Sequence, residues 1–141
     1  MLKLFNMPNR KIKQKVQIVV TADDSILLLK LNEERGGFWQ NATGSVEEHE
    51  LHLDAAKREL YEETGIEAPV YELPMEIDFE DRWGFYVIEK IYHCHLHQLP
   101  DIKLSEEHQE FKWIKYKELI ISDYQFENHF KAAMLSGVDR S

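Results

Sequence analysis

The sequence has very little cysteine, few prolines and glycines, and too few basic residues to balance its acidic ones. With a single cysteine, Cys94, the 141-residue chain cannot form an internal disulfide, so a cytoplasmic protein is expected rather than a secreted disulfide scaffold. No apolar run is long enough to span a bilayer, and the first residues hold no apolar stretch of signal-peptide length. The membrane and secreted classes are therefore disfavoured.

Acidic residues outnumber basic ones by 26 to 17, which gives a formal net charge of −9. Because phosphate backbones select for basic surfaces, a nucleic-acid polymer is not expected as a partner. A small phosphate ligand stays compatible with this charge if it arrives with divalent cations. Apolar residues make up 43% of the chain and no repeat or linker interrupts it, so one globular domain over residues 1–141 is predicted.

Alternating apolar and polar residues predict a sheet. Val16, Ile18 and Val20 alternate with polar residues over 14–21, and a turn then leads to a second strand at 26–31. Further extended segments are expected at 38–43, 70–79, 85–97 and 110–115, and helices at about 51–64 and 124–135. The apolar stripe expected on the closing helix is Phe126, Phe130, Ala133 and Met134. This order predicts an α/β fold, with a mixed sheet and helices packed on it.

Three carboxylates share one face of the first predicted helix. At about 100° per residue, Glu59, Glu62 and Glu63 fall within one arc of roughly 100°. Like charges at this spacing repel one another, and hard oxygen ligands suit Mg²⁺ or Mn²⁺. The alternative is a solvated helix face whose carboxylates pair with Lys57 and Arg58.

A wider pattern favours the metal-binding interpretation. Residues 44–66 fit G-x5-E-x7-R-E-U-x-E-E-x-G-U at every position, where U is aliphatic. The fitting residues are Gly44, Glu50, Arg58, Glu59, Leu60, Glu62, Glu63, Gly65 and Ile66. From average residue usage, a chance match in a chain of this length is roughly one in ten million. The pattern resembles the Nudix box, and the chain resembles the Nudix hydrolases.

This resemblance implies an α/β/α sandwich around a mixed sheet, and hydrolysis of a nucleoside diphosphate linked to another group with Mg²⁺ or Mn²⁺. It also implies roles for individual residues. Glu59, Glu62 and Glu63 would be metal ligands, the Gly44 carbonyl another, and Arg58 would orient the carboxylates.

The general base has two candidates, Glu59 and Glu107. In many relatives a glutamate in a setting similar to Glu107-His108 before Trp113 completes the metal site. The alternative places Glu107 in a solvated loop. One departure from the family pattern is His49, which precedes Glu50 where relatives often carry glycine, so the loop entering the helix is expected to differ in shape.

The segment 38–48, F-W-Q-N-A-T-G-S-V-E-E, resembles the dihydroneopterin triphosphate and dATP pyrophosphohydrolase group. That resemblance implies that a nucleoside or pterin triphosphate is cleaved to monophosphate and pyrophosphate. Alternatives are a diadenosine polyphosphate or nucleotide-sugar hydrolase, and a catalytically silent nucleotide sensor. The intact set of Glu59, Glu62 and Glu63 argues against the sensor. Base preference and the choice between monomer and homodimer are left open.

Residues outside the carboxylate set are candidates for substrate binding. The candidates are Lys13, Lys30, Trp39, Gln40, Thr43 and Trp83. The lysines could meet phosphates and Trp83 could stack on a base, although solvated lysines and a tryptophan packed at a strand turn are the commoner cases. His93, His95 and His97 share one strand face, which reads as a polar outer face more readily than as a zinc site.

Overall fold

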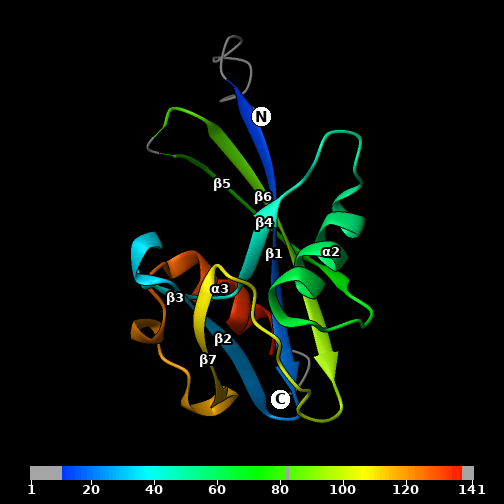
Figure 1. Ribbon diagram of the computed structural model, residues 1–141, viewed down its shortest axis with the longest axis vertical. Coiled ribbons are helices and arrows are strands. Elements are labelled where there is room, and N and C mark those ends of the chain that lie inside the picture. Colours follow the sequence, from blue (N-terminus) through cyan, green and yellow to red (C-terminus); the bar gives the residue numbers. More distant parts are fainter. Residues whose placement is uncertain (1–10, 82, 138–141) are drawn as a thin grey trace.

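The structure is a computed structural model that describes residues 11–81 and 83–137. In these described residues, seven strands form one mixed sheet, and two α-helices and three short 3₁₀ segments accompany it (Figure 1). The strands are β1 (Ile12–Ala22), β2 (Ser25–Leu31), β3 (Trp39–Gln40), β4 (Ala42–Ser45), β5 (Tyr71–Glu80), β6 (Tyr86–Leu96) and β7 (His108–Lys115). The helical segments are η1 (Glu33–Arg35), α2 (His52–Thr64), η2 (Tyr116–Glu118), η3 (Ile121–Asp123) and α3 (Glu127–Ser136).

Strand β1 is the centre of the sheet. It pairs in parallel with β6 along its whole length, from Ile12 opposite Tyr86 to Ala22 opposite Leu96. On its other edge it pairs antiparallel with β4 through residues 15–18 and with β2 at the hairpin turn. Strand β5 extends the sheet beyond β6, while β3 and β7 pair with β2. Strand β4, which leads into the loop before α2, is therefore held against the central strand.

Helices cover both faces of the sheet. Ile18 and Val20 of β1 pack in a core with Leu60 of α2, whereas Val19 packs in a second core with Ala132 of α3. Because side chains alternate along a strand, burial of all three residues requires a covered surface on each side. The expected α/β/α sandwich around a mixed sheet is confirmed. In the described part of the chain, no helix is both long and apolar enough to cross a membrane.

Helix α2 ends as the sequence predicts. Gly65 takes the left-handed conformation at φ 77°, and its N–H donates to the Tyr61 carbonyl over 2.8 Å. Leu51 at the N-cap provides no side-chain cap, which agrees with the absence of a capping Ser or Thr there.

The apolar stripe predicted for the closing helix is wrong in part. Helix α3 begins at Glu127, and its buried residues are His129, Ala132, Ala133 and Ser136. Phe126 precedes the first turn in an extended conformation and is exposed, as is Met134. Two 3₁₀ segments occupy the chain before it, so the helical period starts later than the sequence pattern indicated. The segment predicted at 38–43 likewise divides into β3 and β4, on either side of Asn41.

Candidate active site

A cleft of about 980 Å³ lies where β4, α2, the β5–β6 hairpin and the loop before β7 meet. Small-molecule sites in proteins commonly have volumes of about 300–1,000 Å³. The predicted residues Gly44, Glu59, Glu63 and Glu107 all line this cleft. The structure therefore gathers these four residues around one opening, although Gly44 and Glu107 are 63 positions apart in the sequence.

Two carboxylates of α2 face the cleft one helical turn apart. Glu63 is only 2% exposed, and burial followed by the negative charge of Glu59 raises its pKa well above the usual value. Burial also raises the pKa of Glu59, although the Arg58 guanidinium opposes that shift. Two acidic groups held together away from water resist simultaneous ionisation, so this pair favours a bound proton or cation.

Gly44 lies directly under the Glu59 carboxylate. A Cβ placed on Gly44 would come within 2.0 Å of Glu59 Cδ. Strand β4 brings Gly44 opposite Val16 of β1, and α2 packs over this strand. The glycine thus leaves room for the carboxylate to lie against the backbone of β4.

Arg58 makes hydrogen bonds both to residues before α2, Ser45 and Glu50, and to Glu59 of α2. Its Nε and Nη2 each donate to Glu50 over 2.9 Å, its Nη1 donates to Glu59 over 2.8 Å, and Nη2 also reaches the Ser45 carbonyl. The hydrogen bonds from Arg58 lower the pKa of Glu50 to about 2, and those to Glu50 and Glu59 raise the pKa of Arg58. The arrangement agrees with the predicted orienting role for Arg58.

Glu62 stands apart from the other two carboxylates. Its side chain is 52% exposed, lies 3.2 Å from Arg58 Nη1, and is not among the residues that line the cleft. The role of Glu62 as a metal ligand therefore stays a prediction.

Glu107, the last residue of the loop before β7, and His108, the first residue of β7, approach α2. Glu107 lies 3.7 Å from Arg35, and its negative charge contributes to the raised pKa of Glu63. His108 is buried beside Glu63, with Nε2 3.6 Å from Glu63 Oε1. Burial lowers the pKa of His108, which favours the neutral imidazole. Sequence reasoning quoted His108 as part of the family-like pattern but assigned it no role.

Positively charged and aromatic side chains line other walls of the cleft. Lys15 and Arg35 line it, and neither was predicted. Phe38 and Phe126 meet edge to face with ring centroids 5.6 Å apart, while Phe79 and Trp83 come from the β5–β6 hairpin. Positive groups suit phosphate oxygens, and flat rings suit a base or a pterin. The long-range pairing of β1 with β4, which sets Lys15 opposite Ser45, has no local signal in the sequence.

The structure brings half of the predicted substrate-binding residues to the cleft. Gln40, Thr43 and Trp83 line it, whereas Lys13, Lys30 and Trp39 do not. Lys13 instead lies 4.0 Å from Asp81, with its ammonium over the ring of Phe85. Lys30 pairs with Glu33 and Glu110, each at 3.7 Å. The phosphate contact predicted for Lys13 and Lys30 stays a prediction, and Lys15 is a lysine that does line the cleft.

Thr43 belongs to a buried polar network under the cleft. Its hydroxyl oxygen lies 2.9 Å from the Val16 carbonyl and 3.1 Å from Glu89 Oε2, and Gln17 Nε2 donates to the other oxygen of Glu89. Asn41 continues the network by donating to Gln17 Oε1 over 2.7 Å. The side chain of Thr43 is thereby fixed from below, which leaves its orientation independent of any ligand.

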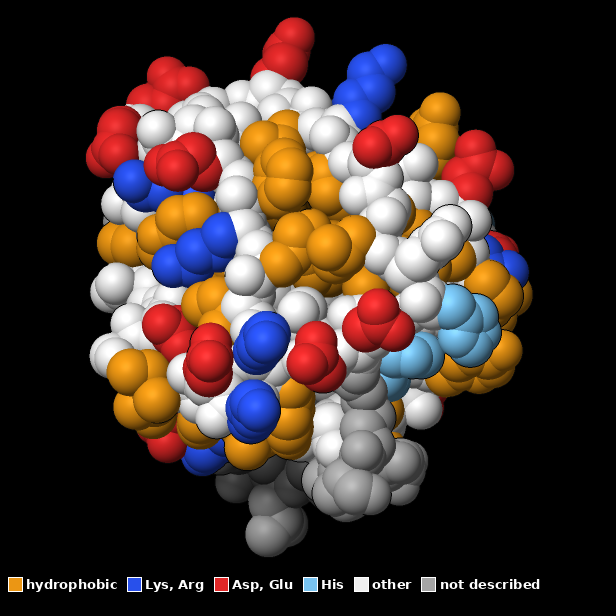
Figure 2. Space-filling model, turned by 90° about the horizontal axis from the view of Figure 1, so that it is seen from below, with side chains coloured by type: hydrophobic (Ala, Val, Ile, Leu, Met, Phe, Trp, Pro, Cys, Tyr) orange, Lys and Arg blue, Asp and Glu red, His pale blue; other side chains and the backbone are white. Residues whose placement is uncertain are grey.

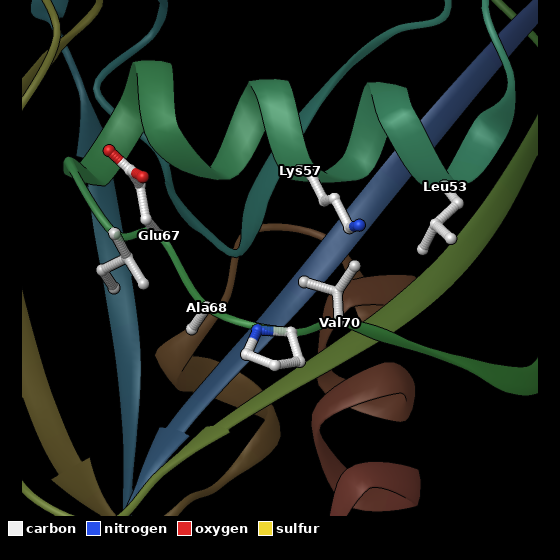
Figure 3. Close-up of a pocket in the computed structure, with 7 residues that line it drawn as sticks. Leu53, Lys57, Glu67, Ala68 and Val70 are labelled. Carbon is white, nitrogen blue, oxygen red and sulfur yellow. The ribbon is translucent and has the colours of Figure 1, made fainter.

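Two surface features lie outside this cleft. Histidine side chains lie side by side on the face seen in Figure 2, where acidic, basic and apolar side chains are mixed. His93 Nε2 and His95 Nδ1 each lie 2.7 Å from Thr21 Oγ1, so these two share one face of β6, whereas His97 lies just beyond the end of that strand. A hollow of about 390 Å³ lies beside α2, with Leu53 and Lys57 of the helix facing Val70 (Figure 3). None of the predicted site residues lines this hollow.

The oxygen atoms that line the cleft suit a divalent cation. Within residues 11–81 and 83–137, no group of three or more His, Cys, Asp or Glu side chains is arranged to hold a metal ion. The donor chemistry nevertheless fits, because Glu63 Oε1 is buried with no hydrogen-bond partner in this part of the chain. Carboxylate and carbonyl oxygens are the ligands that Mg²⁺ and Mn²⁺ prefer. Glu59, Glu63, Glu107 and the Gly44 carbonyl would hold such an ion.

Comparison with known proteins gives one family. The family model described as NUDIX domain matches residues 11–134. The chain is 32% identical to CTP pyrophosphohydrolase of Escherichia coli K12 over 115 residues, which cover 78% of this chain and 81% of that one. It is 27% identical to dihydroneopterin triphosphate diphosphatase of Haemophilus influenzae, with 84% of each chain covered.

A further relative is much longer than this chain. The octanoyltransferase of Myxococcus xanthus is 38% identical over 92 residues, which are 63% of this chain but only 26% of that protein. The chain thus spans about a quarter of that relative's length.

Solved structures share the fold over nearly the whole chain. The dihydroneopterin triphosphate pyrophosphohydrolase of E. coli superposes with a TM-score of 0.75 at 24% identity, covering 88% of this chain and 95% of that one. The NUDIX domain of NrtR from Shewanella oneidensis, complexed with ADP-ribose, superposes with a TM-score of 0.77 at 14% identity. It covers 99% of this chain and 98% of that one.

Proposed function

The chain belongs to the Nudix hydrolase family, and from that membership we propose that it is a Mg²⁺- or Mn²⁺-dependent pyrophosphohydrolase of a nucleoside or pterin triphosphate. The products would be the monophosphate and pyrophosphate. The observation that carries the proposal is the pair Glu59 and Glu63, held together in a cleft that also receives Glu107, Lys15 and an aromatic wall.

The triphosphate assignment rests on relatives and on the cleft. The relatives that are matched over most of their length are named for CTP and for dihydroneopterin triphosphate. Lys15 and Arg35 supply positive charge for phosphate oxygens, and Phe79 and Trp83 offer rings for a flat base or pterin. A location in the cytoplasm, a single domain over 1–141 and a monomeric or homodimeric state stay predictions.

The residues of the cleft divide the chemical work. When bound, a divalent cation supplies charge neutralisation on the phosphate oxygens and a water of lowered pKa. Glu59 and Glu63 would provide carboxylate ligands for this ion, and Glu107 would add a third from across the cleft. Arg58 holds Glu59 in place through a 2.8 Å hydrogen bond. Water loses a proton on attack at phosphorus, and Glu59 and Glu107 are the two candidates to accept it.

A substrate panel with Mg²⁺ tests the proposal. Nucleoside triphosphates, dihydroneopterin triphosphate, dinucleoside polyphosphates and nucleotide sugars would be incubated with the protein, and ³¹P NMR would separate pyrophosphate from orthophosphate. We expect pyrophosphate and a monophosphate from at least one triphosphate. The exposed Glu48 provides a matched control, since E48Q removes one carboxylate of the same box without touching the cleft.

Two results would contradict the proposal. Turnover confined to dinucleoside polyphosphates or nucleotide sugars would replace the triphosphate assignment. Ligand binding without turnover of any compound would favour a nucleotide sensor.

A further inference from the structure

His108 and Glu63 face each other inside the protein without a completed hydrogen bond. His108 Nε2 lies 3.6 Å from Glu63 Oε1, and the two side chains are 1% and 3% exposed. Among the described residues neither atom has a hydrogen-bond partner. An unpaired buried polar atom destabilises a fold, so two such atoms aimed at each other call for an explanation.

The other ring nitrogen of His108 has a defined partner. Ser105 Oγ lies 3.4 Å from His108 Nδ1, and the same oxygen accepts the backbone N–H of Glu107 over 3.2 Å. The serine oxygen accepts from Glu107, and its hydroxyl proton can be donated to Nδ1, which is the arrangement that the proposal below adopts. An imidazole that accepts at Nδ1 carries its proton on Nε2, the atom that faces Glu63.

The loop that provides these contacts is itself anchored. The backbone N–H of Asn32 donates to the Glu107 carbonyl over 2.9 Å, and the Asn32 side chain donates to the Glu106 carbonyl. The loop before β7 is thus fixed to the end of β2, while Glu63 is fixed by α2. His108 is the side chain that spans the space between these two elements.

We propose that His108 is a positioning residue whose Nε2–H tautomer links Glu63 on α2 to the loop that carries Glu107. The link holds two acidic groups from distant parts of the chain at a fixed separation across the cleft. The inference rests on the proposed function, because cation binding is the purpose that this separation would serve. Partners that orient a metal-binding carboxylate typically change metal affinity by about 10–100-fold when they are removed.

The tautomer can be read directly in the metal-free protein. Long-range ¹H–¹⁵N NMR of protein labelled with [¹⁵N]histidine separates the two tautomers. We expect His108 to carry its proton on Nε2, and we expect S105A to shift the Nδ1 resonance. A proton on Nδ1 in the wild-type protein would overturn the proposal. So would a Cd²⁺ titration that gives His108 Nε2 a direct bond to the metal, because His108 would then be a ligand.

Variants of His108 test what the link does. H108L removes both nitrogens, whereas H108Q returns a side-chain N–H near the position of Nε2. In calorimetric titrations of the metal-free proteins with Mn²⁺, we expect H108L to weaken affinity by about 10–100-fold and H108Q by less than about threefold. H97Q, which changes an exposed histidine away from the cleft, is the control. Unchanged affinity in H108L, or no recovery in a folded H108Q, would overturn the proposal.

These measurements stay separate from the fate of the proposed function. If H108L does not fold, S105A and the wild-type tautomer decide the matter. Wild-type protein that binds Mn²⁺ but cleaves no triphosphate would contradict the proposed function, while the affinities of the His108 variants would still support or overturn the link.

Discussion

The α-carbon of Gly44 and the carboxylate of Glu59 occupy adjoining space, and a Cβ on Gly44 would stand 2.0 Å from Glu59 Cδ. Gly44 lies in β4 and Glu59 in α2, so this contact joins the two elements that carry the box. The conformation of Gly44 does not explain the glycine, because its φ is outside the left-handed range. The need for space under Glu59 does.

We therefore expect G44A to displace Glu59 and lower kcat by about a hundredfold, which corresponds to about 2.7 kcal/mol in the activation free energy. Stability should fall by less than about 1 kcal/mol, because a flexible carboxylate can move away from the new methyl group. Steady-state kinetics and urea unfolding measure the two effects. In the background of E59A, the stability cost of G44A should disappear; a cost that persists would place the strain elsewhere.

Replacing Glu63 by glutamine should separate stability from activity. The pKa of Glu63 is raised, so the folded state binds its proton more tightly than the unfolded state does. Its contribution to stability is complete below the usual value of 4.5 and is lost as pH rises through the raised pKa. E63Q should thus be more stable than the metal-free wild type at neutral pH, with a difference that vanishes toward pH 4.

The same variant should lose activity by about a hundredfold or more, since it removes a charged ligand. Mn²⁺ at 100 times its dissociation constant should stabilise the wild type by about 2.7 kcal/mol, and E63Q should gain much less. Thermal unfolding with and without Mn²⁺ at several pH values checks both statements. Near-normal rates in E63Q would remove Glu63 from the site.

Glu50 should show the opposite dependence on pH. Arg58 lowers the pKa of Glu50 from 4.5 to about 2, so the charged carboxylate stabilises the fold above pH 4.5 and this stabilisation is lost as pH falls toward 2. E50Q should cost about 1–2 kcal/mol at pH 7, as expected for hydrogen bonds to a charged group. Urea unfolding of both proteins at pH 7, 5 and 3 should show the difference shrinking only below about pH 4.5. A constant difference would contradict the ion pair.

The sequence predicted the position of strand β1 correctly, but it did not predict that the polar side chains of this strand are buried. Val16, Ile18 and Val20 do form one buried face of β1, but Gln17 and Thr21 on the other face are also fully buried. Polar side chains can be buried where partners satisfy them, and here Glu89 of β6 accepts a hydrogen bond from Gln17 while α3 closes that face. Those partners come from distant parts of the chain, so a local pattern cannot reveal them.

In the candidate site, too, residues placed by local spacing were predictable, whereas residues placed by strand pairing were not. Glu59 and Glu63 were predictable because helical spacing and a wide motif both place them, and the structure puts them in one cleft. Lys15 was missed in favour of Lys13, two residues earlier on the same face of β1. Only the pairing of Lys15 with Ser45 tells the two apart, and this register depends on tertiary structure.

Trp83 is the residue whose removal should change substrate affinity without changing the fold. It is 68% exposed on the β5–β6 hairpin and lines the cleft. Stacking of one base on an aromatic ring is worth about 1–3 kcal/mol, so W83A should raise KM about tenfold or more, with kcat changed far less. W83F should recover most of the affinity. L99A, at another exposed apolar side chain outside the cleft, is the control; an unchanged KM in W83A would show that Trp83 is not in the ring-binding wall.

His49 carries a backbone cost at the position where relatives often have glycine; the sequence predicted a loop of different shape there, not this cost. Its φ is 67°, in the left-handed region, which costs a residue with a Cβ about 1–2 kcal/mol. The side chain is 88% exposed and its contact with Glu48 is correspondingly weak, so little is lost with it. H49G should therefore stabilise the protein by about 0.5–1 kcal/mol after the entropy of glycine in the unfolded chain is counted. H49A retains the Cβ and should leave stability unchanged; equal gains in the two variants would attribute the effect to the imidazole rather than to the backbone.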